Sequence, residues 1–182
     1  PANFNDYFQR YLDFDWQYAR DQIRGYGVGI NMAYEAIDRH IEDGYKDQLA
    51  LIFLGKKGQR ETYSYGQMQE LSDRFANVLS GLGIKKGQLL CSLSDRVPIL
   101  YTAILGCLKA GVVFSPLFSA FGPEPIRSRM EIGKARVLLT SAKYYQKKVA
   151  AWRQWSTTNI PVFVPWIFSL MICIGVRQTP AG

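Results

Sequence analysis

The sequence predicts an α/β fold in which a parallel βαβαβ sheet has flanking helices and is accompanied by a small hairpin. Three short apolar runs, Leu89–Leu93, Val112–Phe118 and Arg136–Thr140, follow one another at nearly equal intervals. Helical patterns beginning near Pro98 and Glu124 separate them. A helix between consecutive strands is typical of parallel sheets. Because the runs are apolar without alternation, we expect strands that are buried on both faces.

A hairpin precedes these units. Leu49–Leu54 is an apolar run, and the Gly-Lys-Lys-Gly turn at 55–58 joins it to the segment Arg60–Tyr63. Two short runs separated by a glycine-containing turn predict two antiparallel strands.

Two helices flank the predicted hairpin. Ser64 and Gln67 form a capping box, and apolar residues at helical spacing follow it as far as Leu82. Upstream, Asn31 is the expected N-cap of a helix over 32–43, whose apolar residues recur at helical spacing.

The chain divides into three parts by its composition. Residues 1–30 are rich in aromatics and are expected to form a peripheral lead-in with one or two short helices, whereas 31–155 carry the α/β pattern. The tail, 156–182, diverges in character and contains a strongly apolar stretch at 160–176. Three interpretations of the tail stay open: a strand and loop of the same domain, a non-native or out-of-frame segment, and a membrane anchor. A span needs ~20 apolar residues, and prolines interrupt this stretch, so we expect no membrane span.

The net charge of +7 is dispersed over the chain. Its lysines occur as separate pairs, such as Lys56 with Lys57 and Lys85 with Lys86, without a long basic run. This distribution argues against a nucleic-acid partner and favours an ordinary solvated surface, or a phosphate-rich ligand such as CoA or ATP.

Cysteine usage indicates the cytoplasm. Cys91, Cys107 and Cys173 are widely spaced in apolar runs, without metal-ligand spacing and in an odd number. Buried free thiols in a reducing compartment are the expected state. The first 24 residues show no apolar core of a signal peptide.

Two polar residues are candidates for catalysis or ligand binding by their chemistry, but we predict structural roles for both. His40 is the only histidine, and spacing suggests no serine, cysteine or carboxylate partner, so we expect a helix-end or surface role. Asp95 follows the strand at 89–93 and is expected to cap the next helix. No catalytic residue and no metal ligand are predicted.

Three stretches of sequence carry a family resemblance. They are Asn31–His40, residues 62–87, and residues 101–140, which include the form Pro-Leu-Phe-Ser-Ala-Phe ending at Phe121. In this order and spacing they resemble the AMP-forming acyl-CoA synthetases, the adenylate-forming family, and the last form is similar to its acetate–CoA ligase branch.

The resemblance implies that the chain is an N-terminal fragment of the family's large domain. The parent would convert acetate, or a similar short acid, with ATP and CoA into acetyl-CoA, AMP and pyrophosphate through acetyl-adenylate, using Mg²⁺. The 182 residues contain no Ser/Thr/Gly-rich loop ending in Pro-Lys-Gly, no acidic ribose motif and no small domain with the adenylation lysine. We therefore expect the fragment to be inactive and to bind none of these cofactors demonstrably.

The resemblance also places a CoA nucleotide site on two segments. Phe118, Ser119 and Ala120 match positions that line it, and core packing is their alternative role. Lys147 and Lys148 lie near arginines that meet a CoA phosphate in relatives, although a lysine offers only a point charge. A solvated helix face is the alternative for both lysines. The competing hypotheses for the whole chain are a non-catalytic module that binds CoA or a partner, and a membrane-tethered domain.

Overall fold

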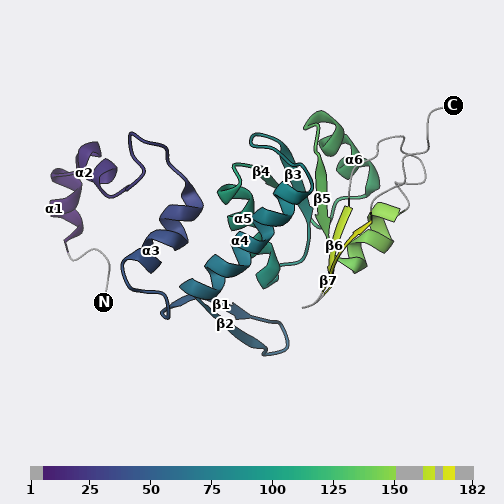
Figure 1. Cartoon of the computed structure of the whole chain (residues 1–182), viewed down its shortest axis with the longest axis horizontal. Helices are drawn as coiled ribbons and strands as arrows, with labels where there is room; N and C mark the ends of the chain where they lie inside the picture. The colour runs from purple at the N-terminus through teal and green to yellow at the C-terminus, as the bar shows by residue number, and fades with distance from the viewer. Residues whose placement is uncertain (1–5, 151–161, 167–169, 175–182) are drawn as a thin grey trace.

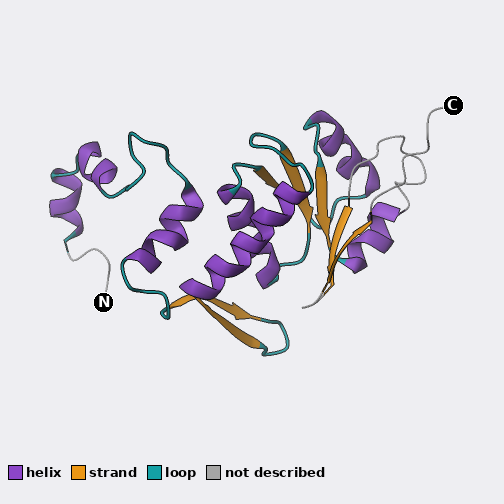
Figure 2. Ribbon diagram, in the orientation of Figure 1, coloured by secondary structure: helices purple, strands orange, loops and turns teal. Residues whose placement is uncertain are grey.

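A computed structural model of the chain describes residues 6–150, 162–166 and 170–174. It confirms the α/β class, with a parallel sheet between helices and a separate two-stranded hairpin (Figure 1, Figure 2). In chain order the elements are α1 (Tyr7–Leu12), α2 (Trp16–Asp21), the π-helical η1 (Tyr34–Asp38), α3 (Arg39–Glu42), β1 (Leu49–Leu54), β2 (Arg60–Ser64), α4 (Tyr65–Gly81), β3 (Leu89–Leu93), α5 (Pro98–Lys109), β4 (Val113–Pro116), α6 (Pro123–Ile132), β5 (Val137–Thr140), α7 (Ala142–Tyr144), the π-helical η2 (Tyr145–Val149), β6 (Val162–Trp166) and β7 (Leu170–Ile174).

The main sheet has the strand order β4-β3-β5-β6-β7. β3 is parallel to both of its neighbours, with Leu90 opposite Phe114 on β4 and Val137 on β5. β6 continues the parallel arrangement, and β7 closes the order antiparallel to β6. The predicted three-stranded unit is therefore confirmed, and described parts of the apolar stretch 160–176 extend it by two strands. The domain boundaries at 30 and 155 stay predictions.

The second predicted strand is shorter than expected. We predicted Val112–Phe118, whereas β4 ends at Pro116 and begins at Val113. At its start, the amide of Val112 donates to the carbonyl of Cys107 at the end of α5. Beyond its end, Phe118 opens a turn in which the amide of Phe121 donates back to the Phe118 carbonyl over 3.0 Å. Val112 and Phe118 are therefore engaged in local hydrogen bonds, although the amide of Leu117 still donates to the carbonyl of Ser92 on β3 over 2.7 Å.

Helices cover both faces of the sheet because successive strand residues point to opposite sides. On one face Leu90, Val137 and Leu139 pack against α4 and α5. On the other face Cys91, Leu93 and Leu138 pack against α6 and the α7–η2 helix. In these two core clusters, fully buried aliphatic side chains predominate. Burial of this area, at about 25 cal/mol per Å², is the main stabilising term for the fold.

The upstream helices follow the predicted signals. The side chain of Asn31 accepts hydrogen bonds from the amides of Ala33 and Tyr34, as expected for an N-cap. The helix it starts contains η1 and α3. For α4, the predicted capping box is present, with Ser64 and Gln67 each satisfying the other's backbone amide.

A half-buried lysine, Lys109, fixes the η1–α3 helix against the domain. The ammonium of Lys109 lies 2.8 Å from Asp38 Oδ1 on η1 and 2.6 Å from Asp73 Oδ1 on α4. Its side chain is only 11% exposed. The side-chain amide of Gln69 also donates to Asp38, over 2.9 Å. Three elements are thereby joined at one cation.

The lead-in, for which one or two short helices were predicted, forms two, α1 and α2, neither of which contains a buried residue. Their aromatic side chains are exposed, as for Phe8 and Trp16. Both helices lie apart from the sheet (Figure 1). None of the helices in the described part of the chain combines the length and the apolar character that crossing a bilayer requires.

Candidate functional site at the carboxyl edge of the sheet

The carboxyl ends of β3, β4 and β5 meet at one edge, because these strands are parallel neighbours. The loop after β3 leads to α5 on one face, whereas the loops after β4 and β5 lead to α6 and α7 on the other. Ligands of open α/β sheets bind where neighbouring loops diverge in this way. This edge is therefore the candidate site.

The loop after β4 presents an exposed aromatic ring. Phe118 is 65% exposed and meets the ring of Phe121 edge-on, with centroids 5.6 Å apart. The guanidinium of Arg129 covers the Phe121 ring at 4.1 Å. Of the other predicted residues, Ala120 is exposed and Ser119 is half-buried. Plain core packing, the alternative for Phe118, is therefore wrong, while its predicted ligand contact stays a prediction.

The structure brings Lys148 to this same loop. Its ammonium donates hydrogen bonds to the backbone carbonyls of Ser119 and Phe121, the second over 2.7 Å. Lys148 is half-buried, so the solvated helix face that we considered for it is not what the structure shows. Lys147 differs: it is exposed and forms neither a hydrogen bond nor an ion pair with any residue that the structure describes.

Asp95 does not cap α5, which corrects the prediction made for it. The N-cap of α5 is Val97, which makes no side-chain cap, and proline occupies the first turn. Instead, Asp95 Oδ1 accepts a hydrogen bond from the hydroxyl of Tyr144 over 2.8 Å. The ammonium of Lys143 lies 3.6 Å from the other carboxylate oxygen. The aspartate thus joins the loop after β3 to the helix after β5.

Tyr144 is the site residue that sequence reasoning missed. Its side chain is buried at 8% exposure, with the hydroxyl on Asp95 and the ring below the ammonium of Lys148, 5.6 Å away. A buried tyrosine hydroxyl needs a polar partner, but these two residues are far apart in the sequence. Only the parallel pairing of β3 with β5 brings them together.

His40 is half-buried in α3 and packs against two tyrosine rings, whereas a helix-end or surface role was predicted for it. Its ring lies 4.7 Å from the ring of Tyr65 and 6.4 Å from that of Tyr45. No hydrogen bond joins its imidazole to a serine, cysteine or carboxylate among the residues that the structure describes.

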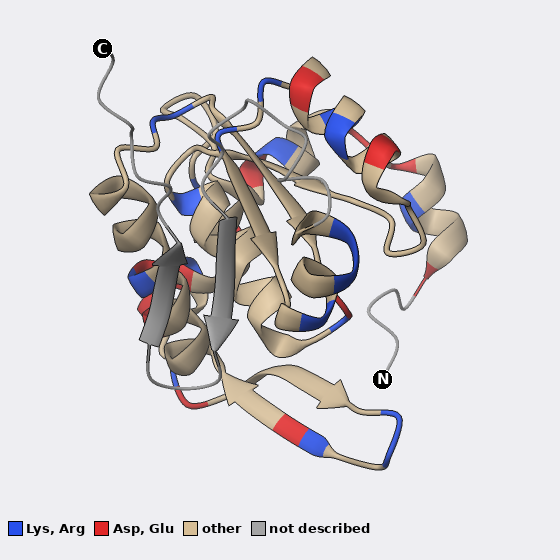
Figure 3. Ribbon diagram, turned by 90° about the vertical axis from the view of Figure 1, so that its right-hand side faces the viewer, with Lys and Arg blue, Asp and Glu red and all other residues tan. Residues whose placement is uncertain are grey.

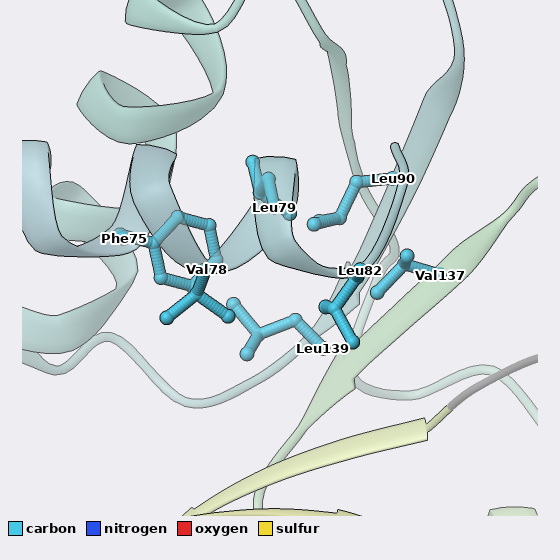
Figure 4. Close-up of a pocket in the computed structure, with 7 residues that line it drawn as sticks. All are labelled: Phe75, Val78, Leu79, Leu82, Leu90, Val137 and Leu139. Carbon is cyan, nitrogen blue, oxygen red and sulfur yellow. The ribbon is translucent and has the colours of Figure 1, made fainter. Parts of the chain in front are cut away.

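The one hollow between α4 and the sheet that Figure 4 shows is apolar and belongs to the core. Seven side chains from α4 and its C-cap, β3 and β5 line it: Phe75, Val78, Leu79, Leu82, Leu90, Val137 and Leu139. Small-molecule sites need a few polar groups that orient the ligand, and this lining supplies none.

Two of the predicted residues carry the kinds of group that a CoA nucleotide requires. An exposed aromatic face and the ammonium of Lys147 are groups that stack on a base and attract a phosphate, as a CoA nucleotide requires. The described residues contain no group of three or more histidine, cysteine or acidic side chains placed to hold a metal. Lys and Arg positions are interspersed with Asp and Glu positions along the described ribbon (Figure 3).

A parallel sheet with its polar loops gathered at the carboxyl edge defines an α/β protein of the class that binds small molecules between such loops. Within this class the comparison is specific. Residues 38–164 match the family described as AMP-binding enzyme, and the chain belongs to this family.

Curated relatives of the chain are acetyl-coenzyme A synthetases. That of Bacillus subtilis (strain 168) is 35% identical over 147 residues, which are 80% of this chain and 26% of the relative. That of Halorhodospira halophila is 36% identical over 141 residues, 76% of this chain and 22% of the relative. The chain thus spans about a quarter of the length of the relatives it matches.

Solved structures agree with the fold. An acyl-CoA synthetase of Brucella canis superimposes with a TM-score of 0.75 at 26% identity, covering 90% of this chain and 29% of that one. A benzoate CoA ligase of Burkholderia xenovorans LB400 gives a TM-score of 0.64 at 20% identity, over 76% of this chain and 26% of that one. The second likeness concerns the fold alone.

Proposed function

We propose that the chain is the N-terminal part of an acetate–CoA ligase. The parent would form acetyl-CoA, AMP and pyrophosphate from acetate, ATP and CoA, with acetyl-adenylate as the intermediate and Mg²⁺ as the metal. The observation that carries this proposal is the 35% identity with the acetyl-coenzyme A synthetase of Bacillus subtilis across 80% of the chain. The reducing cytoplasm is its proposed location, which the free buried thiols of Cys91 and Cys107 support.

CoA is the substrate toward which the chain's own residues would act. Phe118 would offer its exposed ring to the nucleotide base, with Ser119 and Ala120 beside it, and Lys147 would offer an ammonium to a phosphate. CoA supplies the thiol that accepts the acetyl group. We assign no step of adenylation to residues 1–182, because this sequence contains no Ser/Thr/Gly-rich loop ending in Pro-Lys-Gly to stabilise charge on the phosphates, which is usually the largest catalytic term.

The first test is an assay of residues 1–182 for acetate-dependent exchange of pyrophosphate into ATP. We expect a rate equal to that of a blank, with the acetyl-coenzyme A synthetase of Bacillus subtilis as the active control. Exchange that rises with acetate and exceeds the blank would refute the assignment of adenylation to other segments.

The second test addresses the ligase itself. The nucleotide sequence beyond codon 182, read in all three frames, should encode a Ser/Thr/Gly-rich loop ending in Pro-Lys-Gly. The product of that longer frame should form acetyl-CoA from acetate, ATP and CoA. If no frame encodes the loop, while residues 1–182 bind CoA in a calorimeter, the non-catalytic CoA-binding module replaces the ligase proposal.

A further inference from the structure

The turn after β4 is held by a lysine from a distant part of the chain. Within the turn, Phe118 O already accepts the amide of Phe121 over 3.0 Å. Two further carbonyls of the turn, those of Ser119 and Phe121, accept hydrogen bonds from Lys148 Nζ. The single ammonium of Lys148 therefore satisfies two backbone carbonyls of the turn.

The surroundings of Lys148 fix the ammonium in this place. An ammonium has three donors, and two of them serve the carbonyls. The ring of Tyr144 lies 5.6 Å from the nitrogen, at a distance where a cation is attracted to an aromatic face. Tyr144 is itself held by its hydroxyl on Asp95. The chain of contacts therefore runs from the loop after β3, through the helix after β5, to the turn after β4.

We infer that Lys148 is a positioning residue that holds the Phe118–Phe121 turn, and so sets the place of the exposed Phe118 ring, rather than a ligand for a phosphate. Its relevance to CoA rests on the proposed function, but the hydrogen bonds exist in the free chain. The adjacent Lys147, with the same charge and an exposed side chain, has no such partners among the described residues. Lys148 therefore has a structural role, whereas the exposed ammonium of Lys147 is available to a ligand.

Hydrogen–deuterium exchange of residues 1–182, measured by mass spectrometry without ligand, tests this role. Charge-assisted hydrogen bonds are worth enough to change local opening by about ten- to a hundredfold. Lys148→Met should therefore speed exchange in the peptide containing the Phe121 amide by about that factor. The peptides of β3 and β5 should keep their protection, which separates loosening of the turn from unfolding. Lys147→Met removes the same charge one residue away and should leave the turn unchanged.

A graded variant keeps the test decisive if Lys148→Met does not fold. Lys148→Gln retains a neutral donor for one carbonyl, so its turn should exchange faster than wild type but more slowly than the Met variant. The rate of chymotryptic cleavage after Phe118 should follow the same order. Equal exchange of the turn in wild type and either Lys148 variant would overturn the inference.

Addition of CoA separates this inference from the proposed function. If CoA slows exchange of the turn in the wild-type chain, both are supported. If CoA has no effect while the Lys148 variants still loosen the turn, the positioning role stands and the CoA site fails. Loosening by Lys147→Met equal to that by Lys148→Met would instead show a general charge effect and refute the positioning role.

Discussion

Gly106 is the position where a single methyl group gives the sharpest test of the packing. It lies on α5, where the helix crosses α4. A Cβ atom added there would stand 2.8 Å from Cδ1 of Phe75, 2.9 Å from its Cβ, and 2.8 Å from the carbonyl oxygen of Ser72. Two of these three atoms belong to or adjoin the backbone of α4, so rotation of a flexible side chain cannot relieve the overlap.

The magnitude follows from two opposed terms. Phe75 and Ser72 are buried at 6% and 0% exposure, so α4 and α5 must move apart. Overpacking of this kind costs typically about 1–3 kcal/mol. Against it, replacing glycine by alanine inside a helix gains up to about 1 kcal/mol. With the full gain subtracted, we expect Gly106→Ala to lower the free energy of unfolding by up to about 2 kcal/mol.

Gly81→Ala is the matched control. Gly81 ends α4, has no positive φ, and no atom lies within 4 Å of an added Cβ. Only the gain in helix propensity from glycine to alanine remains, so this variant should be as stable as the wild type or slightly more stable. Urea unfolding followed by circular dichroism measures both. A Gly106→Ala variant as stable as Gly81→Ala would refute the close approach of α4 and α5.

Three further predictions concern charged and reactive groups. Lys109→Met leaves its two aspartate partners without their cation and should lower the free energy of unfolding by about 1–3 kcal/mol in urea, whereas the exposed Lys57→Met should change it little. The pKa of Glu35 is held below its usual 4.5, first by the hydrogen bond from Arg39, so the contribution of Glu35 to the free energy of unfolding is present at neutral pH and is lost as pH falls through that lowered pKa. The difference in urea midpoint between wild type and Glu35→Gln should therefore shrink below pH 4.5. A difference that grew at lower pH would contradict this. Burial raises the pKa of the Cys107 thiol to about 12, so iodoacetamide near neutral pH should alkylate it only after unfolding, as peptide mapping would show, and rapid labelling of the folded chain would contradict its burial.

The strand and helix pattern could be predicted because its signals are local. β3 has the predicted bounds, Leu89–Leu93, and α5 begins at Pro98 as predicted, because an apolar run between turns and a proline in a first helical turn are both signals of neighbouring residues. The capping box at Ser64 is equally local. The π-helical segment η1 was not predicted, because apolar residues at helical spacing do not distinguish one extra residue per turn from a regular helix.

The carboxyl edge of the sheet was only partly predictable. Its location follows from parallel strands, and the resemblance directed attention to Phe118 and to Lys148. The partners at this edge have no sequence signature, because Lys148 binds backbone carbonyls, which every residue possesses. For Asp95, a local rule predicted a cap of the next helix. In the structure its carboxylate instead accepts a hydrogen bond from the hydroxyl of the buried Tyr144, on the helix after β5.

The partners of Asp95 and of Lys148 are determined by one physical cause. A cap is worth about 1 kcal/mol and competes with any tertiary partner that also needs an acceptor. The Tyr144 hydroxyl is buried, and leaving it unpaired would cost about 1–3 kcal/mol, so its demand for Asp95 exceeds that of an exposed helix amide. The first turn of α5 accommodates the loss, since proline at its start has no amide to satisfy. At this edge, the needs of buried groups therefore decide which local signals are realised, and the same reasoning places Lys148 with the turn it holds.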